Sequence, residues 1–156
     1  MNLLEKVEVY QLGLDIGYFK LPDVIEWVDS TILQLESTDI PNEFYDVSLS
    51  SKKKIDDVIS LLKELTKGNH IDTASKVLLG LLYQSFVKSE IEMNDVVTFM
   101  YRLAWKRNIE DDIYSEICEL DYEYEIAIDG YGDLQSIITS VQEFLERYKI
   151  YGELLE

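Results

Sequence analysis

The 156-residue chain has little of several residue types that carry chemistry or cross-links. Its one cysteine, Cys118, excludes an intramolecular disulfide and a zinc site made of several cysteines from one chain. The longest apolar run, Val77–Tyr83, is interrupted by Gly80 and is far too short to cross a bilayer. These shortages disfavour a secreted disulfide-stabilised protein and a membrane-spanning one.

Two further features predict a cytoplasmic location, and the net charge bears on the partners. The segment Met1–Lys6 has no apolar core of the kind that a signal peptide carries. A single cysteine suits a reducing compartment. The formal net charge of −17 would repel phosphates and anionic lipids, so we expect neither nucleic acid nor a membrane as a direct partner.

The pattern of apolar residues predicts an all-α fold. Only two prolines and seven glycines occur, and apolar residues recur three and four positions apart through most of the chain. The length suits one domain over residues 1–156, and 47% apolar residues are enough to fold it. We expect a helical bundle or a short array of helical hairpins, with about six or seven helices.

Start and stop signals divide the chain into segments. Residues 1–19 fit either a strand or a first helix, and we favour the helix. Pro22 suits a first helical position. The apolar residues of 72–89 cover most of the circumference of the expected helix, which is typical of a central helix. The other expected helices run from Pro22 to about Ser37, from a cap at Ser50 or Ser51 to a stop at Gly68-Asn69, from Asp72 to about Ser89, from Asn94 or Asp95 to Lys106-Arg107, from Glu110 to Asp129, and from a cap at Asp133, with one turn at Asn42–Tyr45.

The most informative feature is a run of acidic residues near the C-terminus. Twelve carboxylates and no lysine or arginine lie between Arg107 and Arg147, and residues 109–156 carry a net charge of −12. This exceeds the charge of roughly 2 to 8 that keeps a small domain soluble. Such a field weakens the compact state by self-repulsion, so it favours a role in attracting a cationic partner. The competing interpretation, a merely solvated helix face, stays open.

Helical spacing places part of this charge on one face. Four of the carboxylates are spaced four, three and four apart, beside a core stripe that includes Ile113 and Ile117. Tyr122 and Tyr131 lie off that stripe and could anchor a partner, although they could also cover the edge of the core. The predicted partner-binding residues are Asp112, Glu116, Glu119, Tyr122, Glu123, Asp129, Tyr131 and Asp133.

No catalytic, cofactor or metal site is predicted. A dyad of Cys118 and His70 is conceivable, but a packing cysteine and a loop histidine explain both residues more simply. If Gly130 is aligned with position six of a calcium loop, Ala127 and Ser136 fall where ligand oxygens are required, so an EF-hand is rejected. Helix stop and helix cap remain the role of this loop. A carboxylate-metal enzyme would require a bound metal, and no Glu-x-x-His pair supports one.

A small, acidic, cysteine-poor helical chain with tyrosines among its carboxylates resembles the bacterial immunity proteins, which bind and neutralise a toxin. The segments similar to domains associated with polymorphic toxin systems are Gly17–Leu49, with Pro22, Trp27 and Ile40–Phe44, and the Gly130-Tyr131-Gly132 turn before a helix that ends at Phe144-Leu145 and Tyr148. The resemblance implies a cationic partner such as a nuclease toxin. Our leading hypothesis is therefore a toxin-neutralising binding protein; the alternative is a helical adaptor or a homo-oligomer.

Overall fold

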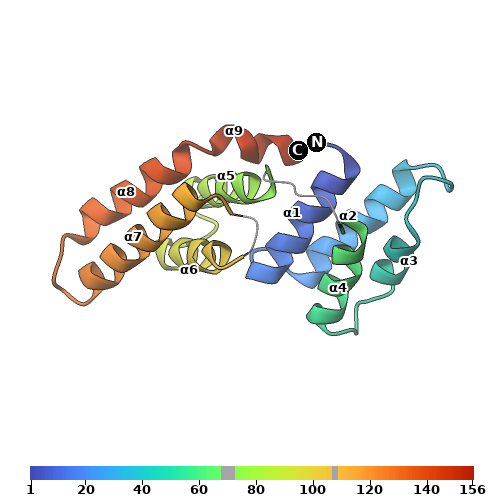
Figure 1. Cartoon of the computed structure of the whole chain (residues 1–156), viewed down its shortest axis with the longest axis horizontal. Helices are drawn as coiled ribbons and strands as arrows, with labels where there is room; N and C mark the ends of the chain where they lie inside the picture. The colour runs from blue at the N-terminus through green and yellow to red at the C-terminus, as the bar shows by residue number, and fades with distance from the viewer. Residues whose placement is uncertain (68–72, 107–108) are drawn as a thin grey trace. The chain divides into compact units, whose positions relative to one another are not determined.

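The computed structural model describes residues 1–67, 73–106 and 109–156 (Figure 1). The chain divides into two compact units, Asn2–Asn69 (the N-terminal unit) and His70–Glu156 with Met1 (the C-terminal unit). The described residues form nine α-helices and one 3₁₀ helix and no strand, so the all-α class is confirmed and the expected count of six or seven is too low. The single domain over residues 1–156 stays a prediction, and each unit is described by itself.

The first helix of the N-terminal unit, α1 (Leu3–Ile16), has a reciprocal cap at its start. The Glu5 amide donates to Asn2 Oδ1 at 2.9 Å, and the Asn2 amide donates to Glu5 Oε2 at 2.7 Å. The helix passes through Gly13 and ends at Gly17, whose φ of 87° is left-handed. The preference for a helix in residues 1–19 is confirmed.

Three helices complete this unit: α2 (Leu21–Gln34), α3 (Asn42–Ser48) and α4 (Ile55–Leu65). α2 packs on α3, and α4 packs on both α1 and α3. Helix α2 begins one residue before Pro22 and ends before the expected Ser37, while α3 is longer than the single turn expected there. The core consists of Val7, Leu14, Val24, Val28, Phe44, Val47, Val58, Ile59 and Leu62.

The predicted cap of α4 at Ser50 or Ser51 is wrong, because Lys54 precedes the helix. The Ser50 hydroxyl is fully buried and donates to the carbonyl of Asp46 at the end of α3, so it is committed to the preceding helix. Ile55, the first residue of α4, is 47% exposed. The expected stop at Gly68-Asn69 lies outside the described residues; α4 ends at Leu65.

The C-terminal unit contains α5 (Thr73–Val87), α6 (Met93–Ala104), α7 (Asp111–Ile128), α8 (Leu134–Glu146), α9 (Lys149–Gly152) and the 3₁₀ helix η1 (Glu153–Leu155). α5 contacts α6, α8, α9 and η1, and α7 lies between α6 and α8 (Figure 1). The expectation that 72–89 forms a central helix is thereby confirmed for α5. α6 begins at Met93 with Glu92 before it, not at Asn94 or Asp95.

The crossing of α5 and α9 depends on two glycines. A Cβ added at Gly80 would lie 2.4 Å from both the amide nitrogen of Gly152 and the carbonyl oxygen of Tyr148. A Cβ at Gly152 would lie 2.7 Å from the carbonyl carbon of Gly80. Only glycine therefore allows the two backbones to approach this closely. The short helix α9 was not expected from the sequence.

The turn between α7 and α8 behaves as predicted. Gly130 adopts a left-handed φ of 86° after the end of α7. Asp133 caps α8, because its Oδ1 accepts the amides of Gln135 at 3.0 Å and Ser136 at 3.2 Å. Ile128 at the end of α7 and Leu134 at the start of α8 are 53% and 41% exposed.

Candidate partner-binding surface

The rotation of α7 about its axis is set by four buried side chains. The predicted core stripe is confirmed, with Ile113, Ile117, Leu120 and Tyr124 each at most 8% exposed. Because this stripe faces the core, the carboxylates of α7 lie on its two flanks and on its outer face. The flanks then face different neighbours, α8 on one side and α6 on the other.

The flank toward α8 forms a groove of about 390 Å³. We call it the acidic groove, because its lining contains four carboxylates and a single cationic side chain. Its residues are Glu116, Glu119, Leu120 and Glu123 from α7, and Ser140, Glu143, Phe144 and Arg147 from α8 and its C-terminal cap.

The flank toward α6 forms a second groove of about 440 Å³, in which Asp121, Glu125 and Asp129 face Asn94 and Thr98. Burial, and then the nearby charge of Glu125, raise the pKa of the Asp121 carboxyl above its ordinary value. Six carboxylates of α7 and its C-terminal cap are therefore divided between two grooves and do not form one continuous face.

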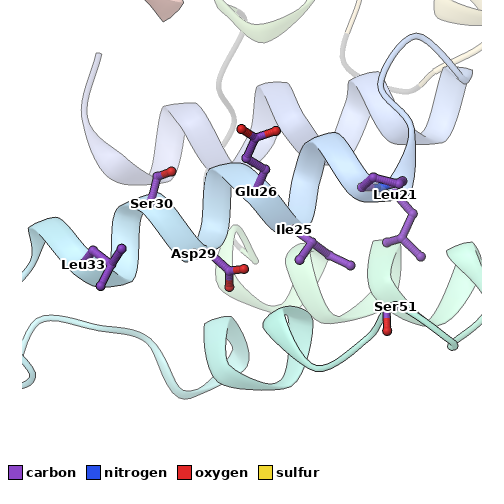
Figure 2. A pocket seen from close by; sticks show the side chains of 8 residues that line it. Leu21, Ile25, Glu26, Asp29, Ser30, Leu33 and Ser51 are labelled. Atoms are coloured by element: carbon purple, nitrogen blue, oxygen red, sulfur yellow. The ribbon is translucent and has the colours of Figure 1, made fainter.

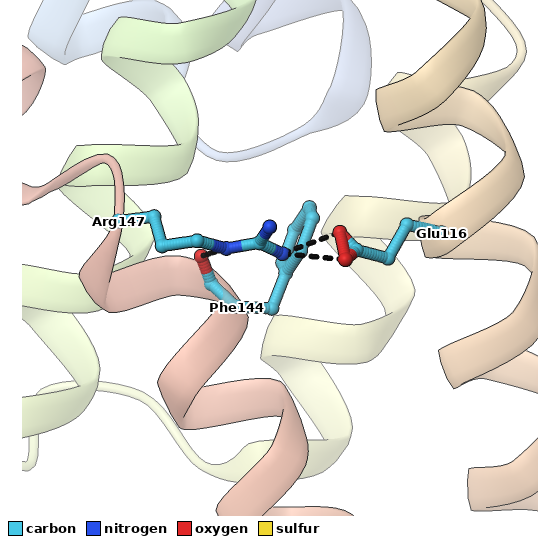
Figure 3. Close-up of polar contacts among 3 residues, drawn as sticks. All are labelled: Glu116, Phe144 and Arg147. Carbon is cyan, nitrogen blue, oxygen red and sulfur yellow. Dashed lines mark hydrogen bonds and ion pairs between the residues drawn. The ribbon is translucent and has the colours of Figure 1, made fainter.

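Arg147 is the cation of the acidic groove, and Figure 3 shows how it is held. Its Nη2 donates to both carboxylate oxygens of Glu116, at 2.6 Å to Oε1 and closer to Oε2. Its Nε donates to the Phe144 carbonyl at 3.4 Å, and its guanidinium carbon lies 4.9 Å from the centre of the Phe144 ring. The groove thus holds a guanidinium group between a carboxylate and an aromatic ring.

Among the described residues, internal cations pair with only a small part of the acidic run. Glu110 pairs with Lys76 at 2.6 Å, and the hydrogen bond between them raises the pKa of the Lys76 ammonium. Glu116 pairs with Arg147. Within residues 1–67, 73–106 and 109–156, the other ten carboxylates of the run form no ion pair. Most of the negative potential is therefore directed to solvent.

The structure brings together three of the eight predicted partner-binding residues. Glu116, Glu119 and Glu123 line the acidic groove, whereas Asp129 lines the groove toward α6. The other four lie outside both grooves: Asp112 is exposed at the start of α7, Tyr122 is 65% exposed, Tyr131 is 86% exposed in the turn, and Asp133 caps α8. The two tyrosines project from the surface and do not cover the core.

The sequence interpretation missed the contribution of α8, namely Glu143, Phe144 and Arg147. A signal for it was present. One face of α8 and its C-terminal cap carries Ser140, Glu143, Phe144 and Arg147, which are three or four positions apart. This face lies beside the buried stripe that contains Val141 and Leu145. Because that face is mixed in charge, it did not stand out from composition alone.

Cys118 is a half-buried free thiol on α7. Its hydrogen bond with Tyr114 raises the pKa of that phenol. Tyr114 also contacts the exposed ring of Trp105 edge-on, with ring centres 6.0 Å apart. The packing interpretation suffices for Cys118, and His70, its conceivable partner, lies outside the described residues.

Among the residues that the structure describes, no three histidine, cysteine or acidic side chains are grouped so that they could hold a metal ion. None of the helices in these ranges combines the length and the apolar character that crossing a membrane requires. Comparisons with protein families, with curated proteins and with solved structures gave no match to this chain.

Proposed function

We propose that this chain is a binding protein whose acidic groove docks on the cationic surface of a partner protein. The observation that carries the proposal is the set of three carboxylates, Glu119, Glu123 and Glu143, that line one groove and form no ion pair among the described residues. Carboxylates that surround one concave surface attract a cationic partner and accelerate its association.

The chemistry of the groove favours arginine as the group that it binds. Glu116 and the Phe144 ring already hold one guanidinium, that of Arg147, through a carboxylate contact and a contact with the ring face. A partner arginine could pair in the same way with Glu119 or Glu123 one or two turns along α7. The exposed rings of Tyr122 and Tyr131 would add rigid apolar contacts at the edge of such an interface.

The particular role that we propose is neutralisation of a toxin in the cytoplasm. A cationic active site, such as that of a nuclease, has the charge that the acidic groove complements, and covering it would block access of a polyanionic substrate. The resemblance to bacterial immunity proteins supports the same role. The partner is then the toxin, and no cofactor is involved.

The test combines charge reversal with salt dependence. The proposal predicts a toxin-like protein encoded beside this chain's gene; that protein would serve as the partner, and affinity would be measured at low and high salt. Glu119→Lys and Glu123→Lys should each weaken binding by about tenfold, chiefly through slower association, and the loss should shrink as salt rises.

Glu125→Lys is the matched control, because it makes the same charge change on the same helix but on the flank toward α6. It should change affinity much less than Glu119→Lys. Equal losses for all three variants would mean that only net charge matters and that the acidic groove is not the site. Unchanged affinity in the two groove variants would also refute the proposal.

The alternative function is a helical adaptor or homo-oligomer that uses charge only for solubility. It is favoured by apolar side chains exposed on the C-terminal unit away from the acidic groove, such as Trp105 at 62% and Ile150 at 65%. A dimer whose mass in solution does not change with salt would support this alternative. A monomer whose only association is salt-sensitive would support the docking function.

A further inference from the structure

The N-terminal unit has a groove of about 400 Å³ along α2, which we call the α2 groove. Its lining consists of Leu21, Pro22, Ile25, Glu26, Asp29, Ser30 and Leu33 from α2 and Ser51 from the segment between α3 and α4. Figure 2 shows Ile25 and Asp29 on the side of α2 toward Ser51, with Glu26 and Ser30 on the opposite edge. The groove therefore lies entirely within one unit and combines apolar side chains with carboxylates.

The apolar row of the groove is partly accessible, because Leu21 and Ile25 are half-buried and Leu33 is exposed. Leu21, Ile25 and Leu33 are spaced by multiples of four and lie beside Val24 and Val28, which the core buries. α2 has 14 residues and α3 only seven, so they are about 21 Å and 10 Å long. A hydrogen bond from the Ser48 hydroxyl to Asp29 ties the end of α3 to the middle of α2. Leu33 beyond it is 88% exposed.

The charged side chains that line the groove are both acidic, and exposed lysines lie just outside it, at Lys20 before Leu21 and at 52–54 after Ser51. Residues 21–51 contain seven acidic residues and no lysine, arginine or histidine. Two of the seven, Glu26 and Asp29, line the groove itself. The three exposed lysines at 52–54 follow directly and bound this negative segment at the Ser51 end. An apolar ligand carrying positive charge on its flanks would match this surface.

We propose that the α2 groove binds a cationic amphipathic α-helix of a partner protein, with apolar side chains against Leu21, Ile25 and Leu33 and lysines or arginines against Glu26 and Asp29. The row from Leu21 to Leu33 extends about 18 Å, which is enough for more than three turns of a docked helix. This site lies on a different unit from the acidic groove and does not depend on the function proposed for it.

Three other occupants fit less well. An extended peptide that binds as an added strand needs a sheet edge, and the described residues form no strand. A second copy of this chain would bring the same net charge of −17, so repulsion opposes it. Anionic lipid headgroups would be repelled by the carboxylates at the groove edge.

The probe for the test is a fluorescent synthetic peptide of leucine and lysine, with leucines spaced to form one apolar helical face. Binding would be measured by anisotropy and located by amide chemical shifts of the isotopically labelled chain. We expect shifts concentrated in α2. A peptide of the same composition with scrambled leucines should bind at least about tenfold more weakly.

Two variants and two matched controls test the location. Leu33→Lys and Glu26→Lys should each weaken peptide binding by about tenfold, as loss of an interface anchor does. Leu49→Lys is the control for Leu33→Lys, because Leu49 is another exposed leucine, at 81% exposure. Glu36→Lys is the control for Glu26→Lys, because Glu36 is an exposed acid outside the groove. Both controls should bind nearly as the unmodified chain does.

Several results would overturn the inference. One is equal binding by Leu33→Lys and Leu49→Lys, and another is a set of shifts confined to α7 and α8, which would assign the peptide to the acidic groove. A chain that is dimeric until Leu33 is replaced would identify a second copy as the occupant. Binding to phosphatidylserine and phosphatidylcholine vesicles that Leu33→Lys abolishes would identify a membrane instead.

Discussion

Replacement of Gly80 by alanine should weaken the C-terminal unit, although alanine is the better helix former. The new Cβ would point at the backbone of α9, 2.4 Å from both Gly152 N and Tyr148 O. These two atoms are themselves joined by a hydrogen bond of 3.4 Å. Neither can move away by a side-chain rotation, so α9 as a whole must shift.

The size of the effect follows from that shift. Ordinary contact for a Cβ begins near 3.4 Å, so α9 must move by about 1 Å from its present contact at 2.4 Å. Overpacking of this kind costs about 1–3 kcal/mol, and alanine in a helix interior returns about 1 kcal/mol. We therefore expect a net loss of up to about 2 kcal/mol. For a unit of this size, each kcal/mol lowers Tm by about 4–8 °C.

Urea denaturation followed by circular dichroism would measure the loss, and hydrogen exchange would locate it in α5 and α9. The control is Gly132→Ala, because a Cβ there would meet Ala127 at 3.4 Å or more and its φ is not left-handed. That variant should be close to neutral. A Gly80→Ala chain that is more stable than the unmodified one, by about the 1 kcal/mol that alanine returns to a helix, would refute the close crossing of α5 and α9.

Two further predictions concern α7 and its connection to α8. The raised pKa of Asp121 means that the folded state disfavours its charge, so Asp121→Asn should raise the urea midpoint near pH 7. This gain should disappear below about pH 4, where Asp121 is protonated in the unfolded chain as well as in the folded one. A gain that persists there would contradict the raised pKa of Asp121. Asp133→Ala should remove the α8 cap and cost about 1 kcal/mol, measured by thermal unfolding, whereas Asp129→Ala, which removes a carboxylate outside the cap, should cost much less. Equal losses for these two variants would refute the capping role.

Local sequence patterns predict burial and helix ends correctly where the residues of one helix face, or a few adjacent residues, supply the information. The stripe of Ile113, Ile117 and Tyr124 is buried as its spacing predicted, because a helix with one apolar face can hide it in only one orientation. The stop at Gly130 and the cap at Asp133 were also correct, since left-handed φ and side-chain capping are properties of a few adjacent residues.

Local signals failed where several residues compete for one role. Ser50 and Ser51 were plausible caps for α4, but Ser50 is buried with its hydroxyl bound to the end of α3. The four residues of α9 are too few to form a stable helix in isolation. That helix exists through its packing on α5, which depends on Gly80 approaching from a distant part of the sequence.

The helical class, the polarised charge and the buried face of α7 follow from the amino-acid sequence, because each depends on composition or on neighbours within a few turns. Which charges share a surface depends instead on how the helices pack. Packing of α8 beside α7 brought Glu143 and Arg147 to Glu116. Asp129, which caps α7 about 3.6 turns beyond Glu116, lies instead on the flank toward α6. Packing likewise decided how much of the apolar row of α2 stays accessible, since burial depends on what other elements cover.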